Sequence, residues 1–160
     1  MRTYIQNYIN IFTYVVIGIM KFTNSDKIIL MSSSLLLCIP GIYGIYTKKY
    51  SHGICSCITS TVSCVYWCNP GPSWLLTIDL FTSKIAALYY GITGIRSCKT
   101  IKQKEVILAV PLTILMISGY TYSNVYWNKN LSNWVYFHAG FHFFTTLSMM
   151  NTLCSLNKIT

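Results

Sequence analysis

Two histidines near the end of the chain, His138 and His142, have the residue type and spacing of a metal-binding pair. They lie in the apolar run YFHAGFHFF. A spacing of four places both side chains on one face of a helix, where two ring nitrogens can bind a single metal ion. Two imidazoles at that spacing can equally hydrogen-bond to neighbouring helices and hold a bundle together. The pair therefore indicates either a metal site or a set of polar contacts between helices.

Other polar side chains also interrupt apolar runs. Asp79 lies in SWLLTIDLFTSKIAALYY, with Lys84 five positions later. Ser56, Ser60 and Ser63 recur at helical spacing in SCITSTVSCVYW and share one helix face. An ionisable group inside a membrane span costs a few kcal/mol, so Asp79 needs either a functional role or a partner such as Lys84. The serine face predicts either a polar site or close packing between helices.

The composition indicates the elements that must position these residues. The chain is 53% hydrophobic and only 9% charged, with a mean hydropathy of +0.48. A water-soluble core of 160 residues cannot hide that much apolar surface, so the sequence predicts one integral membrane domain over residues 1–160. Its expected fold class is all-α, a polytopic transmembrane helix bundle with about six membrane-spanning helices. The expected spans are residues 4–20, 28–46, 53–69, 74–94, 106–125 and 131–153.

Two of these spans have special features. The first is short and carries several polar residues, so it could instead lie on the membrane surface. Pro40 and Gly41 predict a kink in the second span, because proline removes a backbone donor and clashes with the preceding turn.

The basic residues predict the orientation of the bundle. Eight of the twelve Lys and Arg residues fall on the side that holds both chain ends, three fall on the other side, and Lys84 lies within a span. Because basic loops stay in the cytoplasm, both termini are expected there. A net charge of +9 would suggest nucleic acid in a soluble protein. Here the charge lies in short gaps between spans, so we expect membrane lipids and no nucleic acid as partners.

The depth of the polar residues links them to one another. Counted from the non-cytoplasmic ends of their spans at about 1.5 Å per residue, Ser63 lies about 9 Å deep, Asp79 about 8 Å and His138 about 10 Å. Ser60 and His142 lie about one turn deeper. Antiparallel neighbouring helices would therefore bring hydroxyl, carboxylate and imidazoles to one level. The sequence predicts a single buried polar site.

The seven cysteines predict no disulfide framework. Their number is odd, and most lie inside apolar runs, where cysteine acts as a small hydrophobe. Cys55 with Cys57, and Cys64 with Cys68, lack the paired CxxC spacing of a structural zinc site.

The serine face, the aspartate and the final HxxxH together resemble the CREST membrane hydrolase superfamily. That superfamily includes the alkaline ceramidases, the progestin and adipoQ receptors and the myomaker-like proteins. Its members bind zinc and a water within a seven-helix bundle through a Ser-x3-His helix, an Asp about eleven residues later and a terminal His-x3-His. The resemblance covers about residues 53–153. Ser63, Asp79, His138 and His142 match the motif residues.

The chain departs from this pattern at its third zinc ligand. Trp67 stands four positions after Ser63, where the family has histidine. A shifted register makes Ser60-x3-Cys64 the match and offers the Cys64 thiolate as the third ligand, but the gap to Asp79 is then fifteen residues. The chain is also one helix short of seven.

The resemblance implies two alternative functions. In the first, a zinc-dependent hydrolase attacks a lipid amide or ester with a metal-activated water. Asp79 would hold that water or accept its proton, and Ser63 would stabilise the oxyanion. In the second, which the missing ligand favours, the chain is a non-catalytic relative that keeps the polar site for packing or lipid binding.

Overall fold

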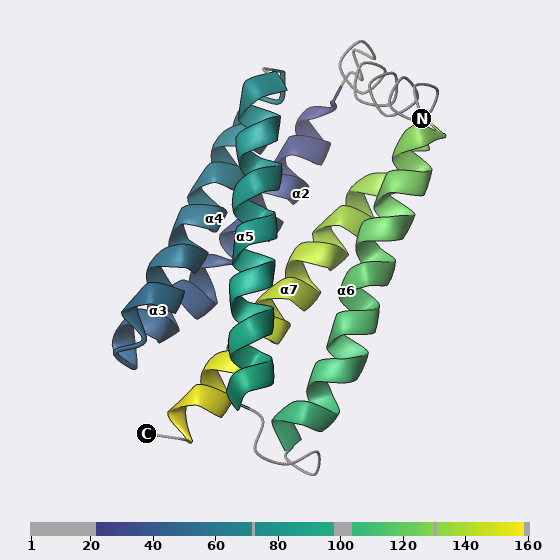
Figure 1. Cartoon of the computed structure of the whole chain (residues 1–160). Coiled ribbons are helices and arrows are strands. Elements are labelled where there is room, and N and C mark those ends of the chain that lie inside the picture. Colours follow the sequence, from purple (N-terminus) through teal and green to yellow (C-terminus); the bar gives the residue numbers. More distant parts are fainter. Residues whose placement is uncertain (1–21, 72, 98–103, 130, 159–160) are drawn as a thin grey trace, which may run out of the picture.

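The computed structural model describes residues 22–71, 73–97, 104–129 and 131–158, and these residues form helices and no strands. The predicted all-α class is confirmed for this part of the chain. The expected first span, residues 4–20, lies outside the described residues. Figure 1 shows the helices running up and down beside one another. They are α2 (Asn24–Leu35), α3 (Cys38–Tyr46), α4 (Tyr50–Cys68), α5 (Ser73–Ser97), α6 (Lys104–Asn128) and α7 (Trp134–Asn157).

Within the described residues, three helical segments are long and apolar enough to cross a membrane: Asn24–Tyr46, which includes α2 and α3, then Trp74–Ser97 and Lys104–Asn128. The helices at the expected spans 53–69 and 131–153 are α4, with 19 residues, and α7, with 24. Both contain many serines, threonines and histidines, several of which are buried against other helices. Their polar content therefore reflects faces turned toward protein.

At the expected kink in the second span, the α-helical hydrogen bonding is interrupted over two residues, Leu36 and Leu37, between α2 and α3. Pro40 has no N–H to donate to the carbonyl of Leu36, and its ring crowds that carbonyl. The chain passes the break through tighter bonds that span three residues, from Leu36 N to Ser33 O at 3.2 Å and from Leu37 N to Ser34 O at 3.1 Å. Helix α4 supplies hydroxyl groups to the carbonyls here: Ser60 Oγ donates to Ser34 O at 2.8 Å. Such donors from a neighbouring helix are what makes a broken helix tolerable in lipid.

Glycines bring α3 and α4 into close contact. A Cβ atom added at Gly44 would lie 2.9 Å from the Cα of Gly53, and one added at Gly53 would lie 2.8 Å from the carbonyl oxygen of Gly41. Both distances are shorter than real Cβ contacts, and both are to backbone atoms, which cannot move aside as a flexible side chain can. The two helices therefore pack at a separation that larger residues would not allow.

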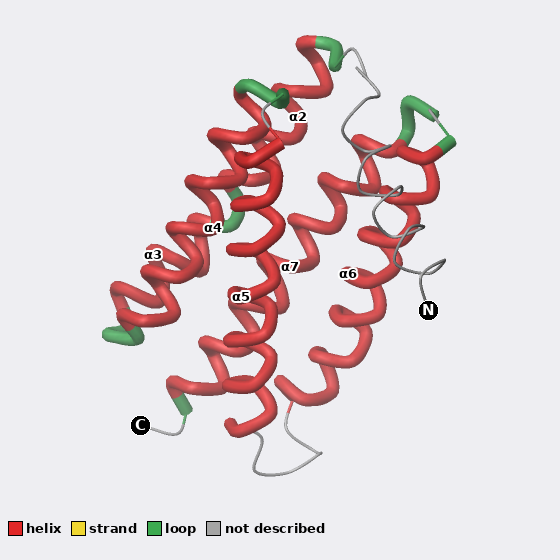
Figure 2. The backbone as a smooth tube through the Cα atoms, turned by 45° about the horizontal axis from the view of Figure 1, so that its top comes forward, coloured by secondary structure: helices red, strands yellow, loops and turns green. Residues whose placement is uncertain are grey.

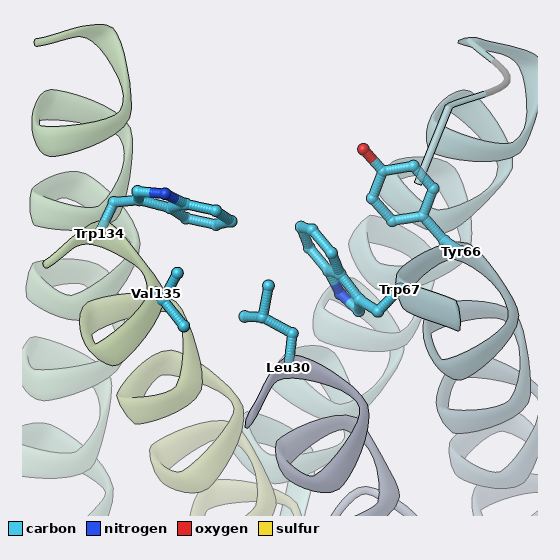
Figure 3. Packing of buried hydrophobic residues seen from close by; sticks show 5 residues of the cluster. All are labelled: Leu30, Tyr66, Trp67, Trp134 and Val135. Atoms are coloured by element: carbon cyan, nitrogen blue, oxygen red, sulfur yellow. The ribbon is translucent and has the colours of Figure 1, made fainter. Parts of the chain in front are cut away.

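Helix α7 holds the bundle together. It packs against α2, α3, α5 and α6, whereas α6 packs mainly against α7. Figure 2 shows α7 running between α5 and α6. A cluster of buried apolar side chains joins α2, α4 and α7 near one end, as Figure 3 shows. The cluster consists of Leu30, Tyr66, Trp67, Trp134 and Val135.

Basic residues gather at the other end of the bundle. The α3–α4 turn, the last turn of α5, the start of α6 and the C-terminal end of α7 all lie there, at the bottom of Figure 1. Glu105 at the start of α6 forms an ion pair with Lys158 just after α7. The amide of Asn151 also donates to the Glu105 carbonyl at 2.7 Å. The described basic residues at this end are Lys48, Lys49, Arg96, Lys104 and Lys158, against Lys27 and Lys129 at the opposite end.

Candidate functional site

Polar side chains from four helices meet inside the bundle. Ser34 Oγ of α2 lies 3.0 Å from Ser63 Oγ of α4 and 3.4 Å from His142 Nδ1 of α7. The Ser63 hydroxyl lies beside the Asp79 carboxyl group of α5 and interacts with it. All four side chains are buried. The structure thus brings together three residues of the predicted site, Ser63, Asp79 and His142, through a serine that the sequence analysis did not single out.

The hydrogen bonds around His142 have a defined direction. Ser33 Oγ and Ser34 Oγ donate to the carbonyl of Leu30, at 2.9 Å and 2.8 Å. A carbonyl can only accept, so each serine uses its single proton there. Ser33 Oγ also lies 3.0 Å from His142 Nδ1 and must accept from it. This arrangement places the imidazole proton on Nδ1 and leaves Nε2 as the acceptor nitrogen.

The same count of hydroxyl protons determines which acceptor Ser63 can donate to. Because the proton of Ser34 goes to Leu30, the proton of Ser63 goes to Ser34 Oγ. The single proton of Ser63 therefore cannot serve both Ser34 Oγ and the Asp79 carboxyl group at once. Oδ1 of Asp79 is buried and has no hydrogen-bond partner among the described residues. The carboxyl group is the least satisfied member of the network.

His138 forms a separate pair with α6. Its Nδ1 lies 3.2 Å from Ser123 Oγ. Its ring centroid lies 5.1 Å from that of Trp67 and 4.7 Å from that of His142. Each imidazole of HxxxH therefore bonds through Nδ1 to a hydroxyl on a different neighbouring helix, His138 to α6 and His142 to α2.

Asp79 and Lys84 do not pair. Five positions along a helix correspond to a rotation of about 140°, so the two side chains leave α5 on opposite faces. Asp79 is 6% exposed, whereas Lys84 is exposed. Among the described residues the ion pair that forms is the one between Glu105 and Lys158. The alternative in which Lys84 is the partner of Asp79 is therefore wrong.

The donors do not fit a zinc ion as they stand. A zinc site needs three or four protein ligands. The Cys64 thiol donates to the carbonyl of Met31 on α2, at 3.7 Å, and Trp67 offers no ligand atom. In residues 22–71, 73–97, 104–129 and 131–158, no group of three or more His, Cys, Asp or Glu side chains could hold a metal ion. The six described cysteines are free thiols.

The remaining histidine, His52, lies in a different cluster at the opposite end of α4. Its ring packs against those of Tyr89 and Tyr90 on α5, with centroids 4.5 Å and 5.1 Å away. The Tyr90 hydroxyl donates to the His52 carbonyl at 2.9 Å. His52 is thus used to join α4 to α5 and does not supply a third ligand.

Three members of the network, Ser33, Ser34 and Ser123, were missed by sequence reasoning. A signal was present for the first two, because the run MSSSLLLC places three consecutive serines inside an apolar span, in the last turn of α2. Ser123 gives no such signal, since a single serine in a membrane helix usually bonds to its own backbone.

Comparison with family models, with curated proteins and with solved structures found no match for the chain. The function is therefore inferred from the geometry of the bundle.

Proposed function

We propose that the chain is a multi-pass integral membrane protein and a divergent, non-catalytic relative of the CREST membrane hydrolases. In this proposal the buried network of Ser63, Asp79, His138 and His142 fixes the helices in register. The protein acts through membrane lipids and partner proteins, and it does not turn over a substrate.

One observation carries the proposal: both imidazoles of HxxxH are contacts between helices, and a tryptophan ring without a ligand atom packs against the pair. His142 Nδ1 bonds to Ser33 and His138 Nδ1 bonds to Ser123. Trp67, at the position where the resemblance expects a third ligand, packs its ring against His138. Interhelical hydrogen bonds of this kind are worth about 0.6 to 2 kcal/mol each in membranes.

The proposal includes about six crossings, with both termini in the cytoplasm. Three apolar helices long enough to cross support membrane insertion. The basic residues at the end that holds the α3–α4 turn and the C-terminus support this orientation, because basic segments remain cytoplasmic. Helices α4 and α7 would also cross the membrane, with their polar faces packed against the other helices.

A zinc-dependent lipid amide hydrolase is the second candidate. Two observations favour it. The ring centroids of His138 and His142 lie 4.7 Å apart, and the tautomer of His142 leaves Nε2 as an acceptor. Asp79 lies on the same polar chain. The shortage of ligands speaks against it.

Metal analysis of the full-length protein, purified in mild detergent with zinc supplied during expression, separates the two candidates. The proposal predicts less than about one tenth of an equivalent of zinc, and an unfolding midpoint that a chelator does not change. Stoichiometric zinc that is lost in His142→Ala, together with ceramide hydrolysis lost in Asp79→Asn, would establish the hydrolase instead. His52→Ala is the matched control, because His52 is buried outside the network.

A further inference from the structure

Lys84 lies on the surface of α5 at a depth in the membrane where a charged group is energetically unfavourable. It lies about 15 Å from the nearer end of the apolar segment Trp74–Ser97, which is close to the middle of a bilayer. Its side chain is exposed. A basic group facing lipid at that depth costs at least a few kcal/mol, and lysines in membrane helices face protein or water. The position therefore requires a partner.

The acids of the chain do not provide that partner. Its three acids all lie in the described residues. Glu105 pairs with Lys158, Asp26 caps α2 through Thr23, and Asp79 is buried on the opposite face of α5. A second copy of the chain has the same three acids and offers no free carboxylate at mid-membrane depth. A carboxylate that pairs with Lys84 must therefore belong to another molecule.

The residues around Lys84 form a surface suited to another helix. Ala87 and Gly91 follow Lys84 by three and seven positions and so share its face. Both are exposed, and a Cβ atom added at Gly91 would meet nothing within 4 Å. Leu88 and Ile95, 65% and 77% exposed, extend the same face. Small residues spaced four apart let a second helix approach closely. In Figure 1, α5 lies in front of α7, on the outside of the bundle.

We propose that this face of α5, the Lys84 face, binds a transmembrane helix of another protein that carries one Asp or Glu near the middle of its span. The carboxylate would pair with Lys84, and the helix would pack against Ala87 and Gly91. The inference rests on the part of the proposed function that places α5 across a bilayer. It does not depend on whether the buried network is catalytic.

The test uses the full-length chain in phosphatidylcholine vesicles, with a fluorescent protein fused to its C-terminus. The probe is a labelled synthetic polyleucine membrane helix with one central Glu, and the control peptide has Gln at that position. We expect the Glu peptide to reach half-maximal energy transfer at a membrane density at least tenfold lower than the Gln peptide. Lys84→Met should abolish this preference, and Lys84→Arg should retain it. Gly91→Leu should weaken binding of the Glu peptide.

Controls keep the result unambiguous. Lys129→Met removes an exposed lysine beyond the end of α6 and should leave the preference intact. Equal binding of the two peptides, or a preference that survives Lys84→Met, would overturn the inference. Energy transfer between copies of the chain that Lys84→Met reduces would also overturn it, in favour of self-association. Alkaline extraction measures insertion separately: a chain that is not inserted refutes the proposed membrane topology as well, whereas an inserted chain that ignores the Glu peptide refutes only the Lys84 face.

Discussion

The indole ring of Trp67 lies edge-on to the imidazole of His138, with ring centroids 5.1 Å apart and ring planes at 71°. The two side chains come from α4 and α7, which otherwise contact each other little. A third zinc ligand at position 67 would therefore lie next to the existing pair, His138 and His142. The space beside the pair is filled by an aromatic ring that packs and does not coordinate.

Trp67→Ala and Trp67→His should consequently differ in their response to zinc. Both lose a large buried ring, which costs about 3 kcal/mol or more. In Trp67→His, three imidazoles come within reach of one ion, and zinc at a hundred times its Kd should restore about 2.7 kcal/mol. Thermal unfolding in detergent with and without zinc measures the difference. Trp127→His is the matched control, because the Trp127 ring contacts Phe22 and Trp134 and neither histidine. An equal zinc response in the control would refute the prediction.

The bond between Ser33 and His142 should be visible as a coupling energy. Each single change, Ser33→Ala or His142→Ala, should lower the free energy of unfolding by about 1 to 3 kcal/mol, because a buried polar group loses its partner. The double variant should lose less than the sum of the two, by about 0.5 to 2 kcal/mol. Unfolding in mixed micelles measures all three. The pair Ser33 and His52 lies in two separate clusters and should be additive, and additive values for Ser33 and His142 would contradict the network.

Asp79→Asn should not destabilise the protein. The amide has nearly the shape of the carboxyl group but no charge, and it adds two donors where Oδ1 has no partner. We expect the free energy of unfolding to stay constant or to rise by about 1 kcal/mol. The contrasting variant is Asp26→Ala, which removes the bond from Thr23 N to Asp26 Oδ2 at 3.0 Å and should lower stability by about 0.5 to 2 kcal/mol. A large loss in Asp79→Asn would show that the carboxylate is paired.

Two glycine substitutions should have opposite effects. Gly44→Ala places a methyl group 2.9 Å from backbone atoms of Gly53 and should push α3 and α4 apart, at a cost of about 1 to 3 kcal/mol. Gly91→Ala meets no atom within 4 Å and should leave stability unchanged or raise it slightly, because alanine favours helix. The unfolding midpoint of each purified variant in one detergent checks this. Equal losses at both positions would argue against close packing of α3 on α4.

Sequence patterns were sufficient for the helices and insufficient for their contacts. Charges and turn residues bounded the runs that became α4 to α7, and Pro40 indicated where the second run is interrupted. The pairing of His142 with Ser33 could not be predicted, because it depends on which helix faces which across 109 positions of sequence. The expected ion pair between Asp79 and Lys84 does not form, because a spacing of five turns the two side chains to different faces of α5. The proposed partner of Lys84 is another molecule, so the sequence of this chain cannot identify it.

The central place of α7 has a consequence for biogenesis. It follows α2 to α6 in the chain and so leaves the ribosome after them, yet α2, α3, α5 and α6 all pack against it. Before α7 is made, Ser33 on α2 and Ser123 on α6 lack the histidines to which they bond. Helix α6 also lacks its main packing partner. In the proposed membrane bundle the earlier helices lack these contacts until α7 has been made, so a nonsense mutation before α7 should leave an unassembled chain for the quality-control proteases.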